Sequence, residues 1–327
     1  MPKTSKDSST EVIAEKIIGT CALCGRVNLN SFAVGYDYEM NTCANKWTFK
    51  KCTYCAHVQL DPRPAISELG VIYPAHYYSY NMSENLSAIV LAGKDFLDRL
   101  KMKSILHHLA SPLINYLDIG CGDGRYLRSI ESNNGISRSN IYGLELNKQT
   151  VDGLRREGFE VFSERVETCD AIHAKSISLA TMFHVIEHVE DPVKVIAKIS
   201  EWMIPGGILA IETPNTESLD ARLFKKTYWG GYHFPRHWHL FNEITLSNLL
   251  QSQGIEPIHV SYQTGHSFWM YSFHHLLLYK LKWTRLSKLF DPMESLFFLV
   301  IFTGLDKIRA AFGMKTSSIL IIGRKVS

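Results

Sequence analysis

Two short motifs near the start of the chain each carry a pair of thiols. They are Cys21-x-x-Cys24 and Cys52-x-x-Cys55, with 27 residues between them. Each turn lets two thiolates face one ion, and two such turns complete the tetrahedral shell that zinc prefers. A redox role would instead need one C-x-x-C motif beside a βαβ pattern, which this region lacks. We therefore predict a structural zinc ion held by these four cysteines, with no open position for catalysis.

A second group of chemically active side chains lies in the segment 230–242. It holds His233, His237 and His239 among aromatic residues, with Arg236 beside them. Histidine is a common general base because its pKa lies close to neutral pH. An arginine suits a phosphate or carboxylate group on a ligand. We predict that this segment removes a proton from a substrate, with His237 as the base, and a structural role is the alternative.

A third pattern, His184-x-x-Glu187-His188, matches one known from a group of zinc peptidases. In those enzymes both histidines lie on one face of a helix. Here the pattern directly follows a strand-like run, and Asp191-Pro192 begins a helix just after it, since proline suits the first helical turn. We therefore predict a loop at the edge of a sheet and not a peptidase helix.

A glycine-rich stretch follows Asp118, with glycines at Gly120, Gly122 and Gly124. The dinucleotide fingerprint would need a further glycine where the chain has Arg125. A pyrophosphate is an anion and binds helix-terminal N–H groups, whereas a ligand with an ammonium group also needs a carboxylate nearby. Asp118 supplies that carboxylate, so the stretch favours a cationic ligand over a dinucleotide.

The elements that position these residues alternate between strand-like and helix-like patterns. Such alternation indicates a parallel, doubly wound α/β sheet that binds ligands at the carboxyl ends of its strands. Glu145 ends the second strand about 20 residues beyond the glycine loop, where ribose hydroxyls are usually held. The segments in question are 115–130, 140–146, 176–183, 191–203 and 206–214.

Taken in order, these motifs resemble those of class I S-adenosylmethionine-dependent methyltransferases over about residues 95 to 325. The resemblance implies a seven-stranded Rossmann-like sheet whose last two strands form a hairpin, for which 256–264 and 317–325 fit. It also implies S-adenosyl-L-methionine as the cofactor. Asp118 and the glycine loop would then hold the methionine end, and Glu145 would bond the ribose.

Three further positions take roles from the same resemblance. Leu146 and His184 would line the cofactor pocket, and the loop near 165–167 would cover the adenine. Ubiquinone-pathway O-methyltransferases have a similar E-x-x-E-H segment that binds a divalent ion. Glu187 and His188 match it, but His184 replaces a carboxylate, the hard oxygen ligand that magnesium favours. This replacement favours His184 as a pocket residue over a catalytic metal.

The cysteine region, together with the aromatic stretch 72–80, is similar to the leader of sugar C-methyltransferases. We predict that this stretch forms a lid over the cofactor, and an ordinary loop packed on the core is the alternative. Those enzymes also have a Y-H-E-H-x-x-Y-F motif. His237 matches its second histidine, but Arg236 replaces its glutamate. The replacement favours O-methylation, with His237 as the base, over C-methylation.

An apolar segment at about 266–314 interrupts the last two predicted strands. We expect a helix in it from Asp291-Pro292 to Gly313. Basic residues are interspersed, at positions 280, 282, 285, 288 and 307. One interpretation is a helical hairpin packed against the core or against a second copy of the chain. The other is a peripheral contact with an anionic membrane surface.

The organisation that we predict has four parts. A flexible N-terminus (1–18) and a zinc-ribbon-like module (19–62) precede a linker or lid (63–94) and a methyltransferase domain (95–327). With 46% hydrophobic and 20% charged residues, the 327-residue chain is predicted to be globular. It shows neither a secretory signal nor an apolar run of about 18 residues. We therefore expect a cytoplasmic protein, peripheral to the inner face of the membrane if the insertion binds lipid.

The sequence thus predicts a methyltransferase that acts on a small sugar-like acceptor, such as a polysaccharide or natural-product precursor. An RNA methyltransferase that grips RNA through the zinc module is an alternative. A net charge of +3 is only a weak hint of anionic partners. The cysteine region is not densely basic, which opposes nucleic acid as a partner. A non-catalytic scaffold is the third hypothesis, and the intact Asp118 and glycine loop oppose it.

Overall fold

The structure is a computed structural model that describes residues 11–74 and 88–326. Residues 75–80 of the predicted lid lie outside this part of the chain. The described residues form two compact units, and each unit is built from three separate stretches of sequence. Unit 1 comprises residues up to 74, 214–242 and 262–319, and unit 2 comprises 88–213, 243–261 and 320–326.

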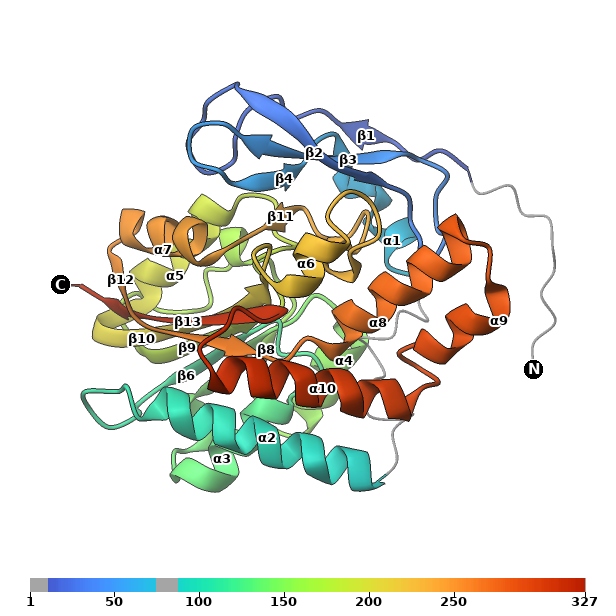
Figure 1. The fold of residues 1–327 in the computed structure, drawn as a ribbon. Helices are drawn as coiled ribbons and strands as arrows, with labels where there is room; N and C mark the ends of the chain where they lie inside the picture. Colours follow the sequence, from blue (N-terminus) through green and yellow to red (C-terminus); the bar gives the residue numbers. More distant parts are fainter. Residues whose placement is uncertain (1–10, 75–87, 327) are drawn as a thin grey trace. The chain divides into compact units, whose positions relative to one another are not determined.

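Unit 2 is built on a seven-stranded sheet, which confirms the predicted methyltransferase-type α/β fold (Figure 1). The strand order is β12-β13-β10-β9-β6-β7-β8, and the four pairs from β10 to β8 are parallel. The last two strands of the sequence are neighbours, as predicted. The strands are β6 (Tyr116–Ile119), β7 (Ile141–Leu144), β8 (Glu160–Phe162), β9 (Ile177–Phe183), β10 (Met203–Pro214), β12 (Ile255–Gln263) and β13 (Ser318–Lys325).

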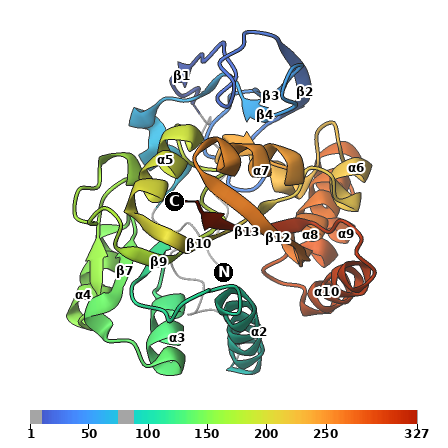
Figure 2. The same cartoon turned by 90° about the vertical axis from the view of Figure 1, so that its left-hand side faces the viewer.

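Helices cover both faces of this sheet. Figure 2 shows α2 and α3 on one face and α5 and α7 on the other. Strand β6 is buried along its whole length. Its Tyr116, Leu117 and Ile119 side chains are apolar or aromatic, as expected for a strand covered on both faces, and Asp118 is the one charged residue in it. The helices are α2 (Ala88–Leu106), α3 (Arg125–Asn134), α4 (Lys148–Arg156), α5 (Pro192–Trp202) and α7 (Glu243–Ser252), with short turns η3 (Arg138–Asn140) and η4 (Val166–Thr168).

Unit 1 contains the cysteine region, in which a four-stranded sheet has the order β11-β4-β3-β2 (Figure 1). Its strands are β2 (Leu29–Gly35), β3 (Trp47–Cys52), β4 (Val58–Leu60) and β11 (His239–Leu240). Strand β11 comes from the predicted histidine segment, far along the chain. A second pair joins β1 (Glu15–Lys16) to β5 (Arg63–Pro64), and η1 (Ile66–Glu68) and α1 (Leu69–Ile72) follow. Parts of the expected flexible N-terminus and linker are therefore regular structure.

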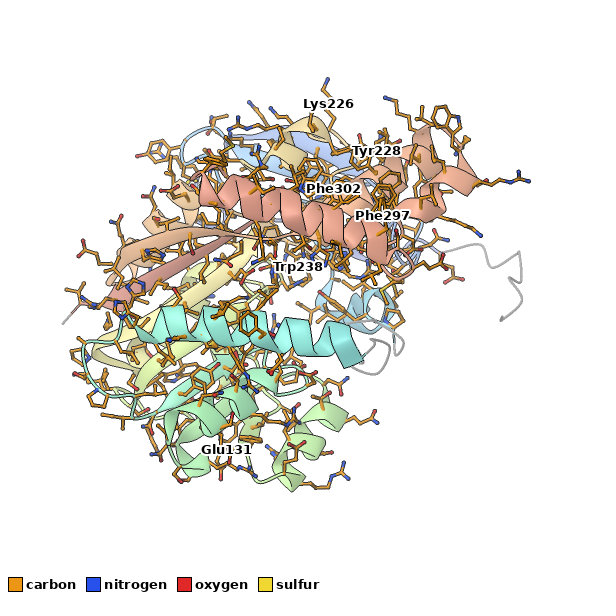
Figure 3. All side chains as sticks on the ribbon, turned by 60° about the horizontal axis from the view of Figure 1, so that its bottom comes forward. Glu131, Lys226, Tyr228, Trp238, Phe297 and Phe302 are labelled. Atoms are coloured by element: carbon orange, nitrogen blue, oxygen red, sulfur yellow. The ribbon has the colours of Figure 1, made fainter. Side chains whose placement is uncertain are left out.

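The insertion between β12 and β13 is helical and also belongs to unit 1. Its core is apolar: the rings of Trp269 and Phe302 stack at 5.5 Å, and Phe302 projects from α10 (Figure 3). The buried carboxylate of Asp306 accepts hydrogen bonds from the Gly265 N–H and Trp269 Nε1. The elements are α8 (His266–His275), η6 (Leu276–Lys280), α9 (Thr284–Ser287), η7 (Lys288–Phe290) and α10 (Leu296–Ala311), and α6 (Leu219–Leu223) and η5 (Gly230–Tyr232) precede them in this unit.

The predicted start of the last helix differs from the structure. Helix α10 begins at Leu296 and not at Asp291-Pro292. The Asp291 side chain instead accepts the Met293 N–H, and its carbonyl accepts the N–H groups of Glu294 and Ser295. Asp291 therefore closes a separate turn before the helix. The predicted end is close to the structure, because Gly313 has φ +66° just after the helix.

Candidate active site and candidate metal centre

The four predicted cysteine ligands converge in unit 1. Their sulfur atoms all lie within 4.8 Å of one another. The Cys21–Cys55 and Cys24–Cys52 sulfur distances are 3.4 and 3.7 Å. Four sulfurs about 2.3 Å from one zinc ion would be roughly 3.8 Å apart, so the cluster has the right size for such an ion. These distances are also too long for disulfides, whose sulfurs are about 2.05 Å apart.

The local backbone explains how each pair of thiols faces inward. Gly25 and Ala56 follow the two motifs with φ +71° and +62°. Their N–H groups close turns on the carbonyls of Cys21 and Cys52. Burial raises the pKa of Cys55 to about 11. Although burial opposes it, N–H groups of the second motif lower the pKa of Cys52 to about 7. A bound cation would favour all four thiolates.

Cys43, a further thiol in this region, lies outside the four-sulfur cluster. It is buried in the apolar core that Trp47, Phe49 and Trp238 help to form. Burial raises the pKa of its thiol. Cys43 is therefore a packing residue in this structure.

The predicted glycine loop lies between β6 and α3 in unit 2. Gly120, Gly122 and Gly124 have φ values of +72°, +51° and +79°, a region that side chains other than glycine rarely enter. A Cβ on Gly120 would come within 2.3 Å of Val185 Cγ2. A Cβ on Gly122 would meet no atom within 4 Å. The loop is thus packed at one glycine and open at the next, where a ligand can approach the backbone.

Asp118 lies at the base of this loop and is almost fully buried. Its Oδ1 accepts a hydrogen bond of 2.7 Å from Thr181 Oγ1, which also contacts the hydroxyl of Tyr116. Among the described residues, no group donates to its Oδ2. Burial raises the pKa of Asp118 to about 7. A cationic ligand would restore the charge and satisfy the second oxygen, so these residues fit an ammonium-bearing cofactor.

Glu145 follows β7 at the same edge of the sheet. Its Oε2 accepts the Gly122 N–H at 3.1 Å, and its Oε1 accepts the Asn147 N–H at 2.9 Å. The carboxylate therefore stands beside the glycine loop, in reach of a ligand held there. The neighbouring Leu146 side chain is largely exposed and offers an apolar contact.

The third sequence pattern is a loop after β9, as predicted, and not a helix. His184 has φ +55°, and its ring lies 3.3 Å from Glu187 Oε1 and 3.5 Å from Glu212 Oε1. Although burial opposes the charge, hydrogen bonds to these two carboxylates raise the pKa of His184 to about 9. The protonated ring is therefore favoured between the two carboxylates. Glu187 also accepts from Thr213 Oγ1 at 3.0 Å, so it orients the loop.

Lys101, on α2, is a charged partner of this loop that the sequence analysis missed. Its Nζ lies 2.7 Å from Glu212 Oε2, and both side chains are mostly buried. Although burial again opposes both charges, the neighbouring Lys101 ammonium lowers the pKa of Glu212, and Glu212 raises that of Lys101. Neither residue belongs to a short motif, and their sequence separation gives no signal of the pair.

The three histidines of the segment 230–242 take different positions in unit 1. His237 is buried, and its Nδ1 donates to the Gly231 carbonyl at 2.8 Å. That bond leaves the lone pair of the neutral ring on Nε2. His239 lies in β11, where its Nδ1 contacts Nε2 of His57 at 3.1 Å. His233 has φ +40°, and its Nδ1 lies 2.7 Å from Glu39.

Arg236, which the sequence suggested for a ligand phosphate, is committed to the protein. Its guanidinium pairs with both oxygens of Asp37 at 2.9 and 3.0 Å. Its Nε donates to the Ile72 carbonyl, and both charged side chains are fully buried. Breaking such a pair would leave an uncompensated buried charge. The expectation is therefore corrected: Arg236 anchors the histidine segment.

A comparison with known families decides what kind of fold carries these sites. A family model described as a methyltransferase domain matches residues 76–260, more than half of the chain. The chain belongs to the methyltransferase-domain family. The matched region contains the Asp118 loop, Glu145 and the His184 loop.

Individual relatives match shorter stretches. The chain is 25% identical over 109 residues to a ubiquinone biosynthesis O-methyltransferase of Actinobacillus pleuropneumoniae serotype 7, which covers 30% of this chain and 45% of that protein. It is 31% identical over 116 residues to an uncharacterized 37.1 kDa protein in transposon TN4556 of Streptomyces fradiae, covering 34% and 33%. The chain thus spans less than half the length of these relatives.

Solved structures resemble the chain at lower identity. A SAM-dependent methyltransferase from Archaeoglobus fulgidus has 18% identity and a TM-score of 0.46, covering 71% of this chain and 94% of that one. Geranyl diphosphate C-methyltransferase from Streptomyces coelicolor A3(2) has 12% identity and a TM-score of 0.47, covering 72% and 82%. We assign no substrate from these similarities.

Proposed function

We propose that this chain transfers a methyl group from S-adenosyl-L-methionine to a small sugar-like acceptor, such as a polysaccharide or natural-product precursor. The observation that carries the transfer is the Asp118–glycine loop–Glu145 arrangement inside a methyltransferase-family domain. When bound, the cofactor supplies a methyl group on a sulfonium, which is already a good leaving group. The protein therefore has mainly to align the acceptor and take its proton.

The cofactor residues have distinct roles in this proposal. Asp118 holds the ammonium, because its buried Oδ2 needs a positive donor. The open backbone at Gly122 admits the methionine end. Glu145 bonds the ribose hydroxyls, while Leu146 and the His184 loop line the pocket. The loop at 165–167 remains the candidate for the adenine.

His237 is the general base in this proposal. With the cofactor bound, Nε2 of His237 would accept the proton of the acceptor hydroxyl as its oxygen takes the methyl group from the sulfonium, which would leave as the neutral thioether. The Gly231 carbonyl supports this role because it holds the proton on the other nitrogen. His233 is the second candidate, and His239 contributes by fixing β11 through His57.

Zinc has a structural part in the same proposal. Four buried or half-buried thiols within 4.8 Å of one another suit a closed tetrahedral site. Such a site would hold together the sheet to which the histidine segment contributes β11. We propose that zinc fixes the place of the base without taking part in the reaction.

The test is methyl transfer by the purified, zinc-loaded chain to a panel of nucleotide sugars. The transfer is measured through the release of S-adenosylhomocysteine and through the mass of the product. His237→Asn should lower kcat by about 100-fold or more, while binding S-adenosylhomocysteine as the wild type does. Transfer RNA and ribosomal RNA form a second arm. Methylation of RNA alone would replace the sugar-like acceptor with the RNA alternative, and binding without any transfer would favour a scaffold.

Peripheral membrane contact is a further part of the proposal, supported by the surface of the insertion. Large apolar side chains are exposed there, including Trp283 at 55% and Phe297 at 68%. Figure 3 labels Phe297 on α10. On α10 they recur at helical spacing, at positions 297, 300, 301, 305 and 308. No helix among the described residues is long and apolar enough to cross a membrane.

The charge of this surface favours anionic lipid as its occupant. Exposed basic side chains accompany the apolar ones, at Lys280, Lys282, Arg285, Lys288 and Lys307. An apolar helix face flanked by cations suits the boundary between headgroups and acyl chains of an anionic bilayer. An acceptor linked to a lipid would be presented at such a surface.

Vesicle binding tests this contact directly. The wild type should sediment with phosphatidylglycerol-containing vesicles and much less with phosphatidylcholine alone. A Phe297→Ser, Val300→Ser double variant should lose most of that binding, whereas Ile244→Ser, an exposed apolar residue on α7, should not. Loss of self-association by the double variant, without any vesicle binding by the wild type, would instead identify a second copy of the chain as the occupant.

A further inference from the structure

The loop after strand β2 places two carboxylates against the histidine segment, about 200 positions away in the sequence. Asp37 pairs with Arg236, and Glu39 Oε2 lies 2.7 Å from His233 Nδ1. All four side chains are buried to at least nine-tenths. These two pairs lie wholly within unit 1. The two pairs have similar distances, but they differ in whether the cationic partner can lose its proton.

The Asp37 pair is permanent. Although burial opposes it, the Arg236 guanidinium lowers the pKa of Asp37. The carboxylate also accepts the N–H groups of Met40 and Thr42 and the Thr42 hydroxyl. An arginine does not lose its proton in proteins. This pair therefore carries no proton in or out and serves as an anchor.

The Glu39 pair is different because its cationic partner is a histidine. Glu39 Oε2 lies 2.7 Å from His233 Nδ1 but accepts no hydrogen bond among the described residues. A buried carboxylate oxygen without a donor is costly unless a positive charge stands beside it. A proton on His233 or on a neighbouring ring would therefore stabilise the buried carboxylate of Glu39.

The groups around this carboxylate leave few places for that proton. The His237 ring is 5.0 Å from the His233 ring. Burial lowers the pKa of His275 to about 4, even though Glu39 opposes the shift, so His275 stays neutral. Burial also raises the pKa of Tyr38 and of Tyr279, so both phenols stay neutral.

Counting only the groups of unit 1 named above, the charges add to one uncompensated negative charge. Asp37 and Arg236 cancel, Glu39 contributes one negative charge, and His275, Tyr38 and Tyr279 contribute none. With both His233 and His237 neutral, the cluster carries a net charge of −1. One proton on either ring makes it neutral, which a poorly hydrated interior favours.

We infer that Glu39 is the counter-ion for the proton that the His233–His237 pair takes from the acceptor. This inference rests on the proposed function and makes Glu39 a positioning residue for methyl transfer. The acceptor O–H proton passes to a ring nitrogen as the oxygen attacks the methyl carbon. The imidazolium that forms is balanced by Glu39, and it returns its proton to water after the product leaves.

The test begins with nuclear magnetic resonance of the zinc-loaded chain with ¹⁵N-labelled histidine, titrated with acid and base. His233→Gln and His237→Gln assign the two ring signals. In Glu39→Gln, the protonation constant of the His233–His237 pair should fall about tenfold or more, as expected when an opposite charge at contact is removed. Glu39→Asp should keep most of the wild-type protonation constant, because it keeps the negative charge. Glu217→Gln, which removes a carboxylate paired with Lys315 in the same unit, should change nothing.

Two outcomes of the titration decide the inference. A protonation constant unchanged in both Glu39 variants would overturn it. The thermal transition shows whether Glu39→Gln folds. If it does not fold, the ring titration is compared between Glu39→Asp and the wild type, each with and without 1 M salt, and this comparison decides the inference. Since the pair is buried, salt should not abolish its effect.

The rate supplies a second readout that a merely structural role would not move. For any nucleotide sugar that is methylated, the rising limb of the pH–rate profile should shift to lower pH in Glu39→Gln by the same factor as the ring titration, with a lower plateau. If the protonation constant of the rings shifts but the rising limb of the pH–rate profile does not, Glu39 has no role in methyl transfer. If the wild type methylates no nucleotide sugar, the proposed acceptor class fails, while the ring titration still decides whether Glu39 is the counter-ion.

Discussion

The Asp118 loop and the Glu39–His233 cluster both place a carboxylate in the protein interior, but they are built in different ways. Asp118 reaches its glycines within six residues and Glu145 within one strand–helix–strand repeat. Glu39 meets His233 across almost 200 positions. The residues of the first site therefore come from one short stretch of sequence, and the second site exists only because two distant segments pack together. The two sites should therefore respond differently to mutation.

Removal of one of the four proposed zinc ligands should have the largest effect, since the distant segments that form the second site depend on the cysteine module. Cys52→Ser should release the ion and destabilise unit 1 by several kcal/mol, because structural zinc contributes directly to folding. Metal content and the thermal transition measure the change. Cys43→Ser is the matched control, since Cys43 is as buried as Cys52 but lies outside the four-sulfur cluster, and it should keep the metal. Equal metal loss in both variants would remove the basis for a four-cysteine site.

The Asp118 site should reveal itself through pH. Burial raises the pKa of Asp118 from 3.8 to about 7, so the folded state binds this proton more tightly than the unfolded chain. The ionised carboxyl therefore costs stability, and the cost grows as the pH rises from about 4 to above 7. Asp118→Asn cannot ionise and should gain stability over the wild type across that range in urea unfolding. A difference between the two proteins that does not change with pH would contradict the buried, ligand-free carboxylate.

Two glycines of the same loop should separate packing from ligand access. Gly120→Ala forces a methyl group onto Val185 and should cost about 1–3 kcal/mol of stability. Gly122→Ala meets only the backbone strain, so it should cost less stability but weaken S-adenosylhomocysteine binding more. Chemical denaturation and calorimetry measure the two quantities. The reverse ranking in stability would show that the loop is arranged differently.

The smallest effect concerns the turn after the second cysteine motif. Ala56 has φ +62°, a conformation that costs a residue with a Cβ about 1–2 kcal/mol. Ala56→Gly relieves that cost but adds freedom to the unfolded chain, worth about 0.4–1 kcal/mol. We expect a net gain of up to about 1 kcal/mol in thermal unfolding with unchanged metal content. Destabilisation would mean that the turn does not hold Ala56 in this conformation.

Sequence reasoning succeeded where periodicity and short spacing carry the signal. The alternating segments predicted the doubly wound α/β sheet, and the resemblance to methyltransferases implied its seven strands. The Asp191-Pro192 start of α5 is present, with Asp191 accepting the Lys194 N–H. The four cysteines also converge as their spacing indicated. Each of these features depends on residues close in sequence or on a strong pairing rule.

The rest could not be predicted because it depends on distant packing. Asp37 and Glu39 lie in the loop just after β2. Nothing in their spacing reveals Arg236 or His233 as partners. Arg236 was therefore assigned to a ligand, although the structure holds it against Asp37. The raised pKa of His184 likewise depends, beside Glu187, on Glu212 from the neighbouring strand β10.

The most direct test of the central claim is calorimetric titration of the zinc-loaded chain with S-adenosylhomocysteine, beside Asp118→Asn. The wild type should bind, and the variant should bind about tenfold more weakly or not at all, because the amide cannot balance the ligand's ammonium group. A folded, zinc-loaded wild type that does not bind S-adenosylhomocysteine would contradict the assignment of this site to methyl transfer.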